Sequence, residues 1–220
     1  QKNNFMGKKF IVSNGMDFQH TSISCSRENI REKYCISESD FVYVNVARMH
    51  PVKNQLSLIK AFSFLEKGRE NVKLIIVGEG VMEEKLKREI LKLKLQHKVI
   101  LTGYRENSID FINAGEVGIL TSFNEGGAPP MVLLESAAVK KFFIAPDVGS
   151  IGDVIGRDLI YLVNPLSVED IYEKMKSAYD KRREIALMGE ILYNNTIDRF
   201  SMNNFCNQYL EAYNEILSGK

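Results

Sequence analysis

Residues 41–55 read FVYVNVARMHPVKNQ, and this stretch decides how the rest of the chain is interpreted. Its first six residues are β-branched or aromatic except for Asn45, which is typical of a strand. Arg48 and Lys53 follow on a connecting loop, and apolar residues three or four apart begin at Leu56, which indicates an amphipathic helix. A strand, a polar loop and a covering helix in this order predict one unit of an α/β sheet.

The same unit recurs along most of the chain, where short β-branched or aromatic runs alternate with segments of helical period. The expected strands are residues 41–46, 74–77, 99–101, 117–120, 142–145 and 160–163. The expected helices are residues 26–34, 56–65, 82–95, 168–187 and 202–217. We therefore predict an α/β fold with a doubly wound, Rossmann-like parallel sheet and a C-terminal helical tail.

The first residues fit this alternation poorly. Residues 9–13 predict an isolated strand, and Asn14-Gly15 is a turn signal. We interpret residues 1–38 as a connector, residues 39–166 as the sheet domain, and residues 167–220 as helices that complete this domain.

Composition excludes several classes of function. Lysine and arginine total 29 against 28 aspartates and glutamates, so the net charge gives no reason to expect a nucleic-acid partner. The apolar runs are far shorter than the roughly 20 residues that cross a bilayer, so we expect no membrane span. Three cysteines without a CxxC spacing are typical of reduced thiols and of a cytoplasmic protein, and three isolated histidines predict no built-in metal site.

Open parallel sheets bind ligands at the carboxyl ends of their strands, so the loops there hold the candidate residues. Arg48 and Lys53, with charged heads toward solvent, are candidates for binding a diphosphate; the alternative is two solvated surface cations. Gly103 and Tyr104, after the third expected strand, are candidates for bordering a nucleobase; the alternative for the tyrosine is ordinary packing. Gly78-Glu79-Gly80 lacks the third glycine of a dinucleotide-binding fingerprint.

The loop after the fourth expected strand is the most informative, and residues 121–136 read TSFNEGGAPPMVLLES. Pro130 suits the first turn of a helix. An anion would then meet the helix dipole and the free backbone amides of Met131, Val132 and Leu133. Glu135, about a turn and a half into this helix, is placed to accept hydrogen bonds from two vicinal sugar hydroxyls.

In this order, the segments resemble the C-terminal domain of the retaining GT-B glycosyltransferases known as glycosyltransferase family 4 or group 1. Residues 14–17 (NGMD) are similar to the family's "NG(I/V)D" segment, and residues 47–55 to "GRL-x-P-x-KG". Residues 130–135 (PMVLLE) are similar to "LP-x-x-x-x-E", and residues 147–153 (DVGSIGD) to "D-x-GG-x-x-E". Each segment alone is a weak signal, but the ordered set is specific.

The resemblance implies that residues 39–166 bind a nucleotide-sugar donor, a UDP- or GDP-sugar. Arg48 and Lys53 would hold its diphosphate, Glu135 its ribose, and Glu125 would be the catalytic carboxylate that faces the sugar. No permanently bound cofactor and no metal are implied, because the cationic loop and the helix start would neutralise the diphosphate.

The resemblance also implies a longer enzyme. Its other partner would be an N-terminal acceptor-binding domain that residues 1–38 connect to, and without this domain we expect donor binding but no transfer. The full-length enzyme would transfer a sugar with retention of configuration in surface polysaccharide or lipopolysaccharide assembly. Peripheral association of that enzyme with a membrane is left open.

The sequence departs from the family pattern in two places. The family has seven residues between its two glutamates, whereas nine separate Glu125 from Glu135, and Gly127 stands at the position of strict register. We favour a bulged loop that still delivers Glu125; the alternative is loss of the first carboxylate. Lys140 and Phe142 stand where the family usually has Gly and Pro.

Three other functions stay open. A nucleotide-sugar epimerase of similar fold would release free nucleotide without an acceptor. A Rossmann oxidoreductase would bind NADH, although the glycine fingerprint is missing. A non-catalytic nucleotide-binding module would bind donor and transfer nothing even in the full-length protein.

Overall fold

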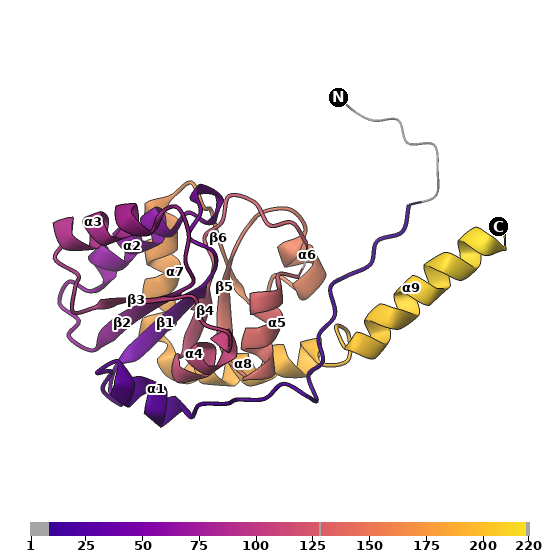
Figure 1. Ribbon diagram of the computed structural model, residues 1–220, viewed down its shortest axis with the longest axis horizontal. Helices are drawn as coiled ribbons and strands as arrows, with labels where there is room; N and C mark the ends of the chain where they lie inside the picture. Colours follow the sequence, from indigo (N-terminus) through magenta and orange to yellow (C-terminus); the bar gives the residue numbers. More distant parts are fainter. Residues whose placement is uncertain (1–8, 128, 219–220) are drawn as a thin grey trace.

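The computed structural model describes residues 9–127 and 129–218. Its centre is a parallel six-stranded sheet of order β3-β2-β1-β4-β5-β6 (Figure 1). The strands are β1 (Phe41–Val46), β2 (Val72–Val77), β3 (Val99–Gly103), β4 (Val117–Ile119), β5 (Phe142–Pro146) and β6 (Tyr161–Val163). The strand order reverses between β1 and β4, so the doubly wound Rossmann-like fold is confirmed.

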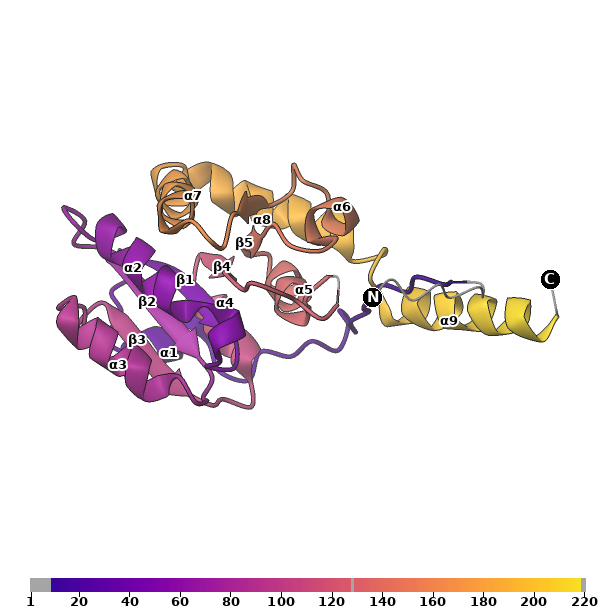
Figure 2. The ribbon, with the colours of Figure 1, turned by 90° about the horizontal axis from the view of Figure 1, so that it is seen from above.

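Helices cover both faces of the sheet (Figures 1 and 2). They are α1 (Arg27–Lys33), α2 (Gln55–Leu65), α3 (Glu83–Lys92), α4 (Ser108–Ala114), α5 (Met131–Ala138), α6 (Ile151–Ile155), α7 (Val168–Asp180), α8 (Arg182–Thr196) and α9 (Met202–Leu217), with a short 3-10 helix η1 (Pro51–Lys53). Side chains of α2, α3 and α7 pack on one face, and those of α1 and α4 on the other. Because all six strands are parallel, the loops at their carboxyl ends share one edge of the sheet.

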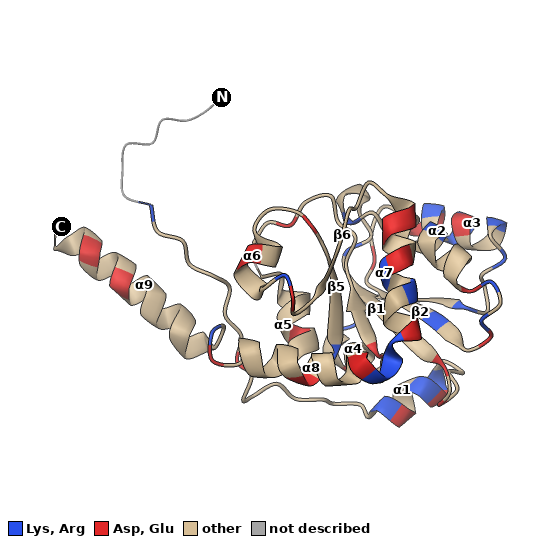
Figure 3. Cartoon of the chain, turned by 180° about the vertical axis from the view of Figure 1, so that it is seen from behind, with Lys and Arg blue, Asp and Glu red and all other residues tan. Residues whose placement is uncertain are grey.

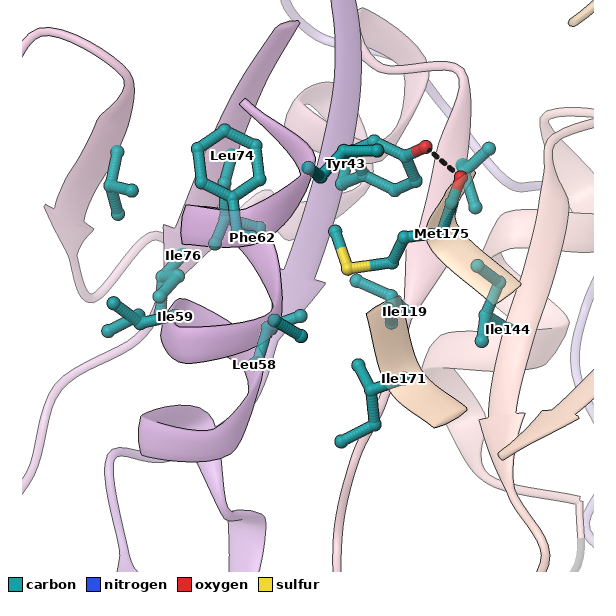
Figure 4. Close-up of a cluster of buried hydrophobic side chains, with 14 of the residues drawn as sticks. Tyr43, Leu58, Ile59, Phe62, Leu74, Ile76, Ile119, Ile144, Ile171 and Met175 are labelled. Carbon is teal, nitrogen blue, oxygen red and sulfur yellow. Dashed lines mark hydrogen bonds between the residues drawn. The ribbon is translucent and has the colours of Figure 1, made fainter. Parts of the chain in front are cut away.

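Alternation along β1 explains the two layers. Tyr43 points into the cluster beneath α2 and α7, whereas its neighbours Val42 and Val44 point into the cluster beneath α1 and α4. Figure 4 shows Tyr43 beside Met175, whose carbonyl accepts a hydrogen bond from the tyrosine hydroxyl at 2.6 Å. Burial raises the pKa of Tyr43 well above its usual value, so the phenol stays protonated and the buried donor is paired.

The expected strands are confirmed to within two residues at each end. The single helix predicted over residues 168–187 is wrong, because the chain leaves helical geometry at Lys181 and continues as α8. Apolar positions stay in register across this break, from Ala178 to Ile185, so the periodicity does not reveal it. The strand predicted over residues 9–13 is also absent from the described chain, and the short helices α4 and α6 were not predicted.

The described part of the expected connector is partly fixed to the sheet domain through α1. Arg31 is 1% exposed, and its guanidinium donates hydrogen bonds to the carbonyls of Ala114, Ser37 and Asp40 at 2.8, 2.5 and 2.7 Å. It also lies 3.5 Å from the carboxylate of Glu116. A buried arginine with these partners holds α1 at the amino edge of the sheet.

The last helix, α9, projects away from the sheet (Figures 1 and 2). Its start is joined to the connector, because the amide of Met16 donates to the carbonyl of Phe200 at 2.8 Å and the amide of Met202 to the carbonyl of Met16 at 3.0 Å. Ala212 is the buried residue of α9, while several large apolar side chains are exposed: Met202, Tyr209, Leu210, Tyr213, Ile216 and Leu217.

Candidate functional site

A pocket at the carboxyl edge of the sheet, here the central pocket, encloses about 360 Å³. It lies where the strand order reverses, between the ends of β1 and β4 and the start of α5. Its lining residues come from segments far apart in the sequence: Asn14, Val46, Ala47, Arg48, Lys53, Ser108, Leu120, Glu125, Gly127, Pro130, Met131, Val132 and Glu135. The position agrees with the switch-point rule for open α/β sheets.

The loop after β1 is held by a close backbone approach. Gly78 and Gly80 have φ values of 133° and 149°, and a side chain on either would overlap the carbonyl oxygens of Ala47 and Met49. The Met49 amide donates to the carbonyl of Glu79 at 2.8 Å. The two glycines therefore let the loops after β1 and β2 lie against each other, which fixes the backbone that carries Arg48.

Asn54 fixes the far end of the same loop. It stands where the family pattern has glycine, and its φ of 54° is in the left-handed region that asparagine tolerates better than most residues. Its side-chain amide donates to the carbonyls of Thr121 and Pro165 at 3.2 and 2.8 Å, and the amide of Phe123 donates to the carbonyl of Val52 at 2.9 Å. These bonds place Lys53 beside the loop that follows β4.

Lys53 and Glu125 form an ion pair inside the central pocket. The ammonium lies 2.8 Å from each carboxylate oxygen, and the two side chains are 22% and 10% exposed. The expectation that the charged head of Lys53 points to solvent is therefore wrong, because Asn54 and Thr121 turn it toward Glu125. The loop between Glu125 and Glu135 nevertheless brings both carboxylates to one pocket.

Arg48 behaves differently from Lys53. It is exposed, and its guanidinium has no hydrogen-bonding or ionic partner among residues 9–127 and 129–218. Its backbone is fixed, since the side-chain amide of the buried Gln55 donates to its carbonyl at 3.1 Å. A guanidinium group on a fixed backbone, with its N–H donors unpaired in the described chain, is suited to bind an anion.

The amino end of α5 provides unpaired donors. The helix begins at Met131, with Pro130 before it as the N-cap residue, one position later than the sequence suggested. In the described part of the chain the amides of Met131 and Val132 have no partner, and both residues line the pocket. Leu133 was expected to add a third amide, but its N–H donates to the carbonyl of Pro130 at 3.0 Å and its side chain is fully buried. Two amides are therefore open to an anion.

Glu135 is the unusual carboxylate of the site. It is half-buried, and no cation of the described chain pairs with it. Burial raises its pKa, and the Ser108 hydroxyl, 3.5 Å from Oε2, opposes this only in part. A desolvated carboxylate with spare acceptor capacity is suited to a ligand that donates hydrogen bonds, such as a pair of hydroxyls.

A second pocket, here the side pocket, adjoins the central pocket through Val46, Ala47, Arg48 and Ser108, and encloses about 540 Å³. Tyr104 lines it and is 64% exposed, so its ring is available to a planar group. Gly103 does not line either pocket; its carbonyl accepts a hydrogen bond from the Gly78 amide at 2.9 Å. Its contribution is the turn at the end of β3, where its φ is 71°.

Sequence reasoning missed two residues of the site. Ser108, the first residue of α4, lies between the two pockets, and a polar residue in the loop after a strand was the available signal. Asn14 reaches the central pocket from the expected connector, and its side-chain amide donates to the carbonyl of Pro129 at 2.9 Å. Its segment was recognised, but nothing in the spacing revealed its contact with the loop before α5.

The described residues contain neither a metal-binding cluster nor a membrane-spanning helix. Within residues 9–127 and 129–218, no group of three or more histidine, cysteine, aspartate or glutamate residues is arranged to hold a metal ion. No helix in these same ranges is both long and apolar enough to cross a membrane.

A family model described as glycosyl transferases group 1 matches residues 26–194. The match covers most of the chain, including every lining residue of the two pockets except Asn14. The chain therefore belongs to the group 1 glycosyltransferase family.

Individual relatives match shorter parts. An uncharacterized glycosyltransferase of Methanocaldococcus jannaschii is 32% identical over 123 residues, which are 56% of this chain and 30% of the relative. An N-acetylgalactosaminyltransferase of Campylobacter jejuni that acts on a diphospho-undecaprenol-linked acceptor is 33% identical over 122 residues, 54% of this chain and 32% of the relative. The chain spans about a third of the length of these curated relatives.

Solved structures agree on the fold. The crystal structure of Anabaena HepE in complex with UDP and glucose superposes with a TM-score of 0.82 at 19% identity, over 93% of this chain and 56% of that one. At this identity the likeness establishes the fold alone, and this chain corresponds to about half of that protein.

Proposed function

We propose that this chain is the donor-binding part of a glycosyltransferase whose substrate is a nucleotide-sugar, UDP- or GDP-linked. The observation that carries the proposal is the convergence in the central pocket of Arg48, the open amides of α5 and the unpaired carboxylate of Glu135. The cation and the amides suit a diphosphate, and the carboxylate suits a ribose diol. A diphosphate bonded to a ribose is the part that all nucleoside diphosphates share.

The side pocket would then take the base. It opens from the central pocket beside Ser108, next to Glu135, and Tyr104 offers an exposed ring at its wall. A ribose held at Glu135 would direct a base into this space. The crystal structure of HepE with UDP and glucose supports the choice of a nucleoside diphosphate, since that protein has the same fold.

The ion pair between Lys53 and Glu125 gives the proposal a definite order of events. In this structure each side chain neutralises the other. A diphosphate would compete for the ammonium of Lys53, and this would release the carboxylate of Glu125 toward the sugar. Glu125 is thus the proposed catalytic residue, and its charge becomes available only when a donor is present.

The whole enzyme requires a second part. We propose that residues 1–38 connect residues 39–220 to an acceptor-binding domain, consistent with the small share of each relative that this chain spans. The exposed apolar side chains of α9 suit a surface that such a domain would cover. Transfer with retention of configuration, in the assembly of a surface glycan, is proposed from family membership and from the names of the relatives. Transfer without a metal ion is proposed because Arg48, Lys53 and the start of α5 could neutralise the diphosphate.

A calorimetric titration tests donor binding. The 220-residue chain is titrated with UDP, GDP, ADP and the corresponding nucleotide-sugars, and we expect weak binding of one base class with no sugar transfer. Binding should be weak because domain closure, which excludes water from such sites, needs the other domain. Absence of heat with all of these ligands would contradict the proposal, and so would transfer by the pure monomeric chain.

A further inference from the structure

A third cavity lies at the opposite edge of the sheet, and we name it the amino-edge pocket. It encloses about 420 Å³ between α1, the turn from α5 to β5, and the first turns of α8. Glu116 and Lys141, which line it, immediately precede β4 and β5, so it lies at the amino ends of these strands. Figure 3 shows basic residues on α1 and at the junction of α7 and α8, on this side of the molecule.

The charges of this cavity do not balance. Four cations, Arg27, Lys140, Lys141 and Arg182, line it together with two carboxylates, Glu116 and Glu190. Arg27 pairs with Glu116, and Lys140 lies 2.9 Å from Glu190. Arg182 stacks over the ring of Tyr179 at 5.5 Å, and the half-buried ammonium of Lys141 has no polar partner in the described chain. The cavity therefore has an excess of positive charge that no side chain of the described residues neutralises.

Lys141 is the residue most affected. Burial lowers the pKa of its ammonium, and the positive charges of Arg27 and the buried Arg31 lower it further, while Glu116 opposes them. A compact anion in the cavity would remove this repulsion. The shift agrees with the geometry, in which the Lys141 ammonium lies near two guanidinium groups, and the one carboxylate among them, Glu116, is already paired with both arginines.

Lys140, on the wall of the same cavity, has an unusual backbone conformation. It closes α5 in the left-handed conformation, with φ of 57°, while its amide and that of Lys141 donate to the carbonyls of Ala137 and Ser136. Glycine usually occupies this position of a helix end, because an L side chain costs about 1–2 kcal/mol in this conformation. Its carbonyl also packs so closely on Gly189 that a side chain there would overlap it.

The contacts of the Lys140 side chain are together of the same size as that cost, because its ammonium also lies 5.4 Å from the ring centroid of Tyr193, and such a cation–π contact contributes about 0.5–1 kcal/mol. Its ion pair with Glu190 is half-exposed on both sides, and such pairs contribute about 0–1 kcal/mol. The dipole of α5 favours a cation at this end by about 0.3–1 kcal/mol. None of these effects requires cations of α1 and α8 to meet at the same cavity. An anionic ligand that contacts Lys140 together with these cations accounts for that arrangement.

We propose that the amino-edge pocket binds a phosphate group, carried by a soluble molecule or by a lipid headgroup, between Lys141, Lys140 and Arg182. The site is separate from the central pocket and does not depend on the proposed donor function. Helix α5 begins at the central pocket, and the residues that directly follow its end, Val139 and Lys140, line the amino-edge pocket.

The test follows individual backbone amides, because inorganic phosphate would also reach the open amides of α5. Phosphate is titrated at constant ionic strength into the 220-residue chain, and NMR shifts of the amides of Lys140, Lys141 and Ile185 are recorded. We expect saturable shifts of all three. Lys141→Met should weaken this binding about tenfold, which corresponds to one charge-assisted contact. The matched control, Lys174→Met, removes a lysine that lies over Tyr161 outside the cavity and should change nothing.

Lys140→Gly tests whether phosphate binding can be lost while the chain stays folded. This substitution relieves the left-handed strain, so the melting temperature should stay within a few degrees while phosphate binds several-fold more weakly. Vesicles with and without phosphatidic acid distinguish the two sources, since co-sedimentation that Lys141→Met abolishes assigns the group to a lipid. Unshifted amides at millimolar phosphate, an equal response to chloride, or unchanged binding in both variants would overturn the proposal.

Discussion

Two arginines at opposite edges of the sheet, Arg31 and Arg48, differ in how their charge is paired. At the amino edge, Arg31 is buried, and its guanidinium donates three hydrogen bonds to backbone carbonyls and lies near Glu116. At the carboxyl edge, among residues 9–127 and 129–218, Arg48 is exposed without a partner, and Glu135 is half-buried without a paired cation. Removing one member of a buried charged network is costly, and a desolvated carboxylate such as Glu135 is unfavourable unless a ligand completes it, whereas an exposed guanidinium is solvated by water. Pairing and burial together therefore distinguish Arg31, a structural charge, from the two candidate binding charges.

The largest effect on stability should come from replacing Arg31. Arg31→Met removes the donor of three buried hydrogen bonds and leaves Glu116 with less compensation, so we expect a loss of about 3–5 kcal/mol in the free energy of unfolding. Urea denaturation measures it. Arg88→Met, on the exposed face of α3, is the control and should change stability by less than about 0.5 kcal/mol. Equal stability of the two variants would contradict the structural role of Arg31.

Arg48→Ala should show the reverse behaviour. The side chain has no partner in the described structure, so the melting temperature should not change. Binding of a nucleoside diphosphate should weaken by roughly tenfold to a hundredfold, because one charge-assisted contact contributes about 1.5–3 kcal/mol. Calorimetry with the diphosphate and with the uncharged nucleoside measures the difference. Equal losses for both ligands would show that Arg48 does not act on the diphosphate.

Glu135→Gln should separate binding from stability at a single residue. The ionised carboxylate accepts hydroxyl hydrogen bonds more strongly than an amide, so the variant should bind the nucleotide about tenfold more weakly, with or without its sugar. In wild type, affinity should fall as the pH decreases through the raised pKa of Glu135, because protonation removes the charge. A pH-independent affinity in wild type would exclude this role.

The same shift fixes the sign of a stability change. The folded state holds the Glu135 proton more tightly than the unfolded state, so this stabilisation is complete below the unfolded pKa and is lost as pH rises through the folded pKa. Glutamine does not ionise, so Glu135→Gln avoids the destabilisation that the buried charged carboxylate causes above this pKa. At neutral pH we expect the variant to melt at an equal or higher temperature than wild type, as measured by calorimetric scans of the unliganded chain. A lower melting temperature would mean that the carboxylate is structural.

The smallest effect on diphosphate binding should come from Glu125→Gln. This change removes the counter-charge of Lys53, so the bare diphosphate should bind equally well or a few-fold more tightly. In the full-length enzyme, transfer should fall mainly in kcat if the carboxylate acts in the transition state. Wild-type transfer by that variant would show that Glu125 is not catalytic. Weaker binding of the bare diphosphate would contradict the proposed exchange of partners.

Local features of the chain were predictable from the sequence, whereas long-range ones were not. The strands were found because buried parallel strands are short continuous runs of β-branched and aromatic residues, as in β1 and β5. The break at Lys181 was missed because apolar spacing passes through it, and α4 because seven residues are too few to establish a helical period.

For the central pocket, too, the residues were predictable from local sequence, but their contacts with one another were not. Arg48, Lys53, Glu125 and Glu135 were selected from the loops after strands, and all four line one pocket. Their pairing was not predictable, since the contact of Lys53 with Glu125 joins residues 72 positions apart and depends on the hydrogen bonds of Asn54. The open helix start was predicted with three amides, but the first turn uses that of Leu133 internally.

The apolar side chains of α9 affect how the isolated chain must be handled. Helix α9 projects from the sheet and exposes apolar side chains along its C-terminal half: Tyr209, Leu210, Tyr213, Ile216 and Leu217. Such surfaces adhere to one another in solution, so sedimentation of the isolated chain should depend on protein concentration. A dimer seen at high concentration would then report this adhesion, and stoichiometries from titrations should be compared at several dilutions.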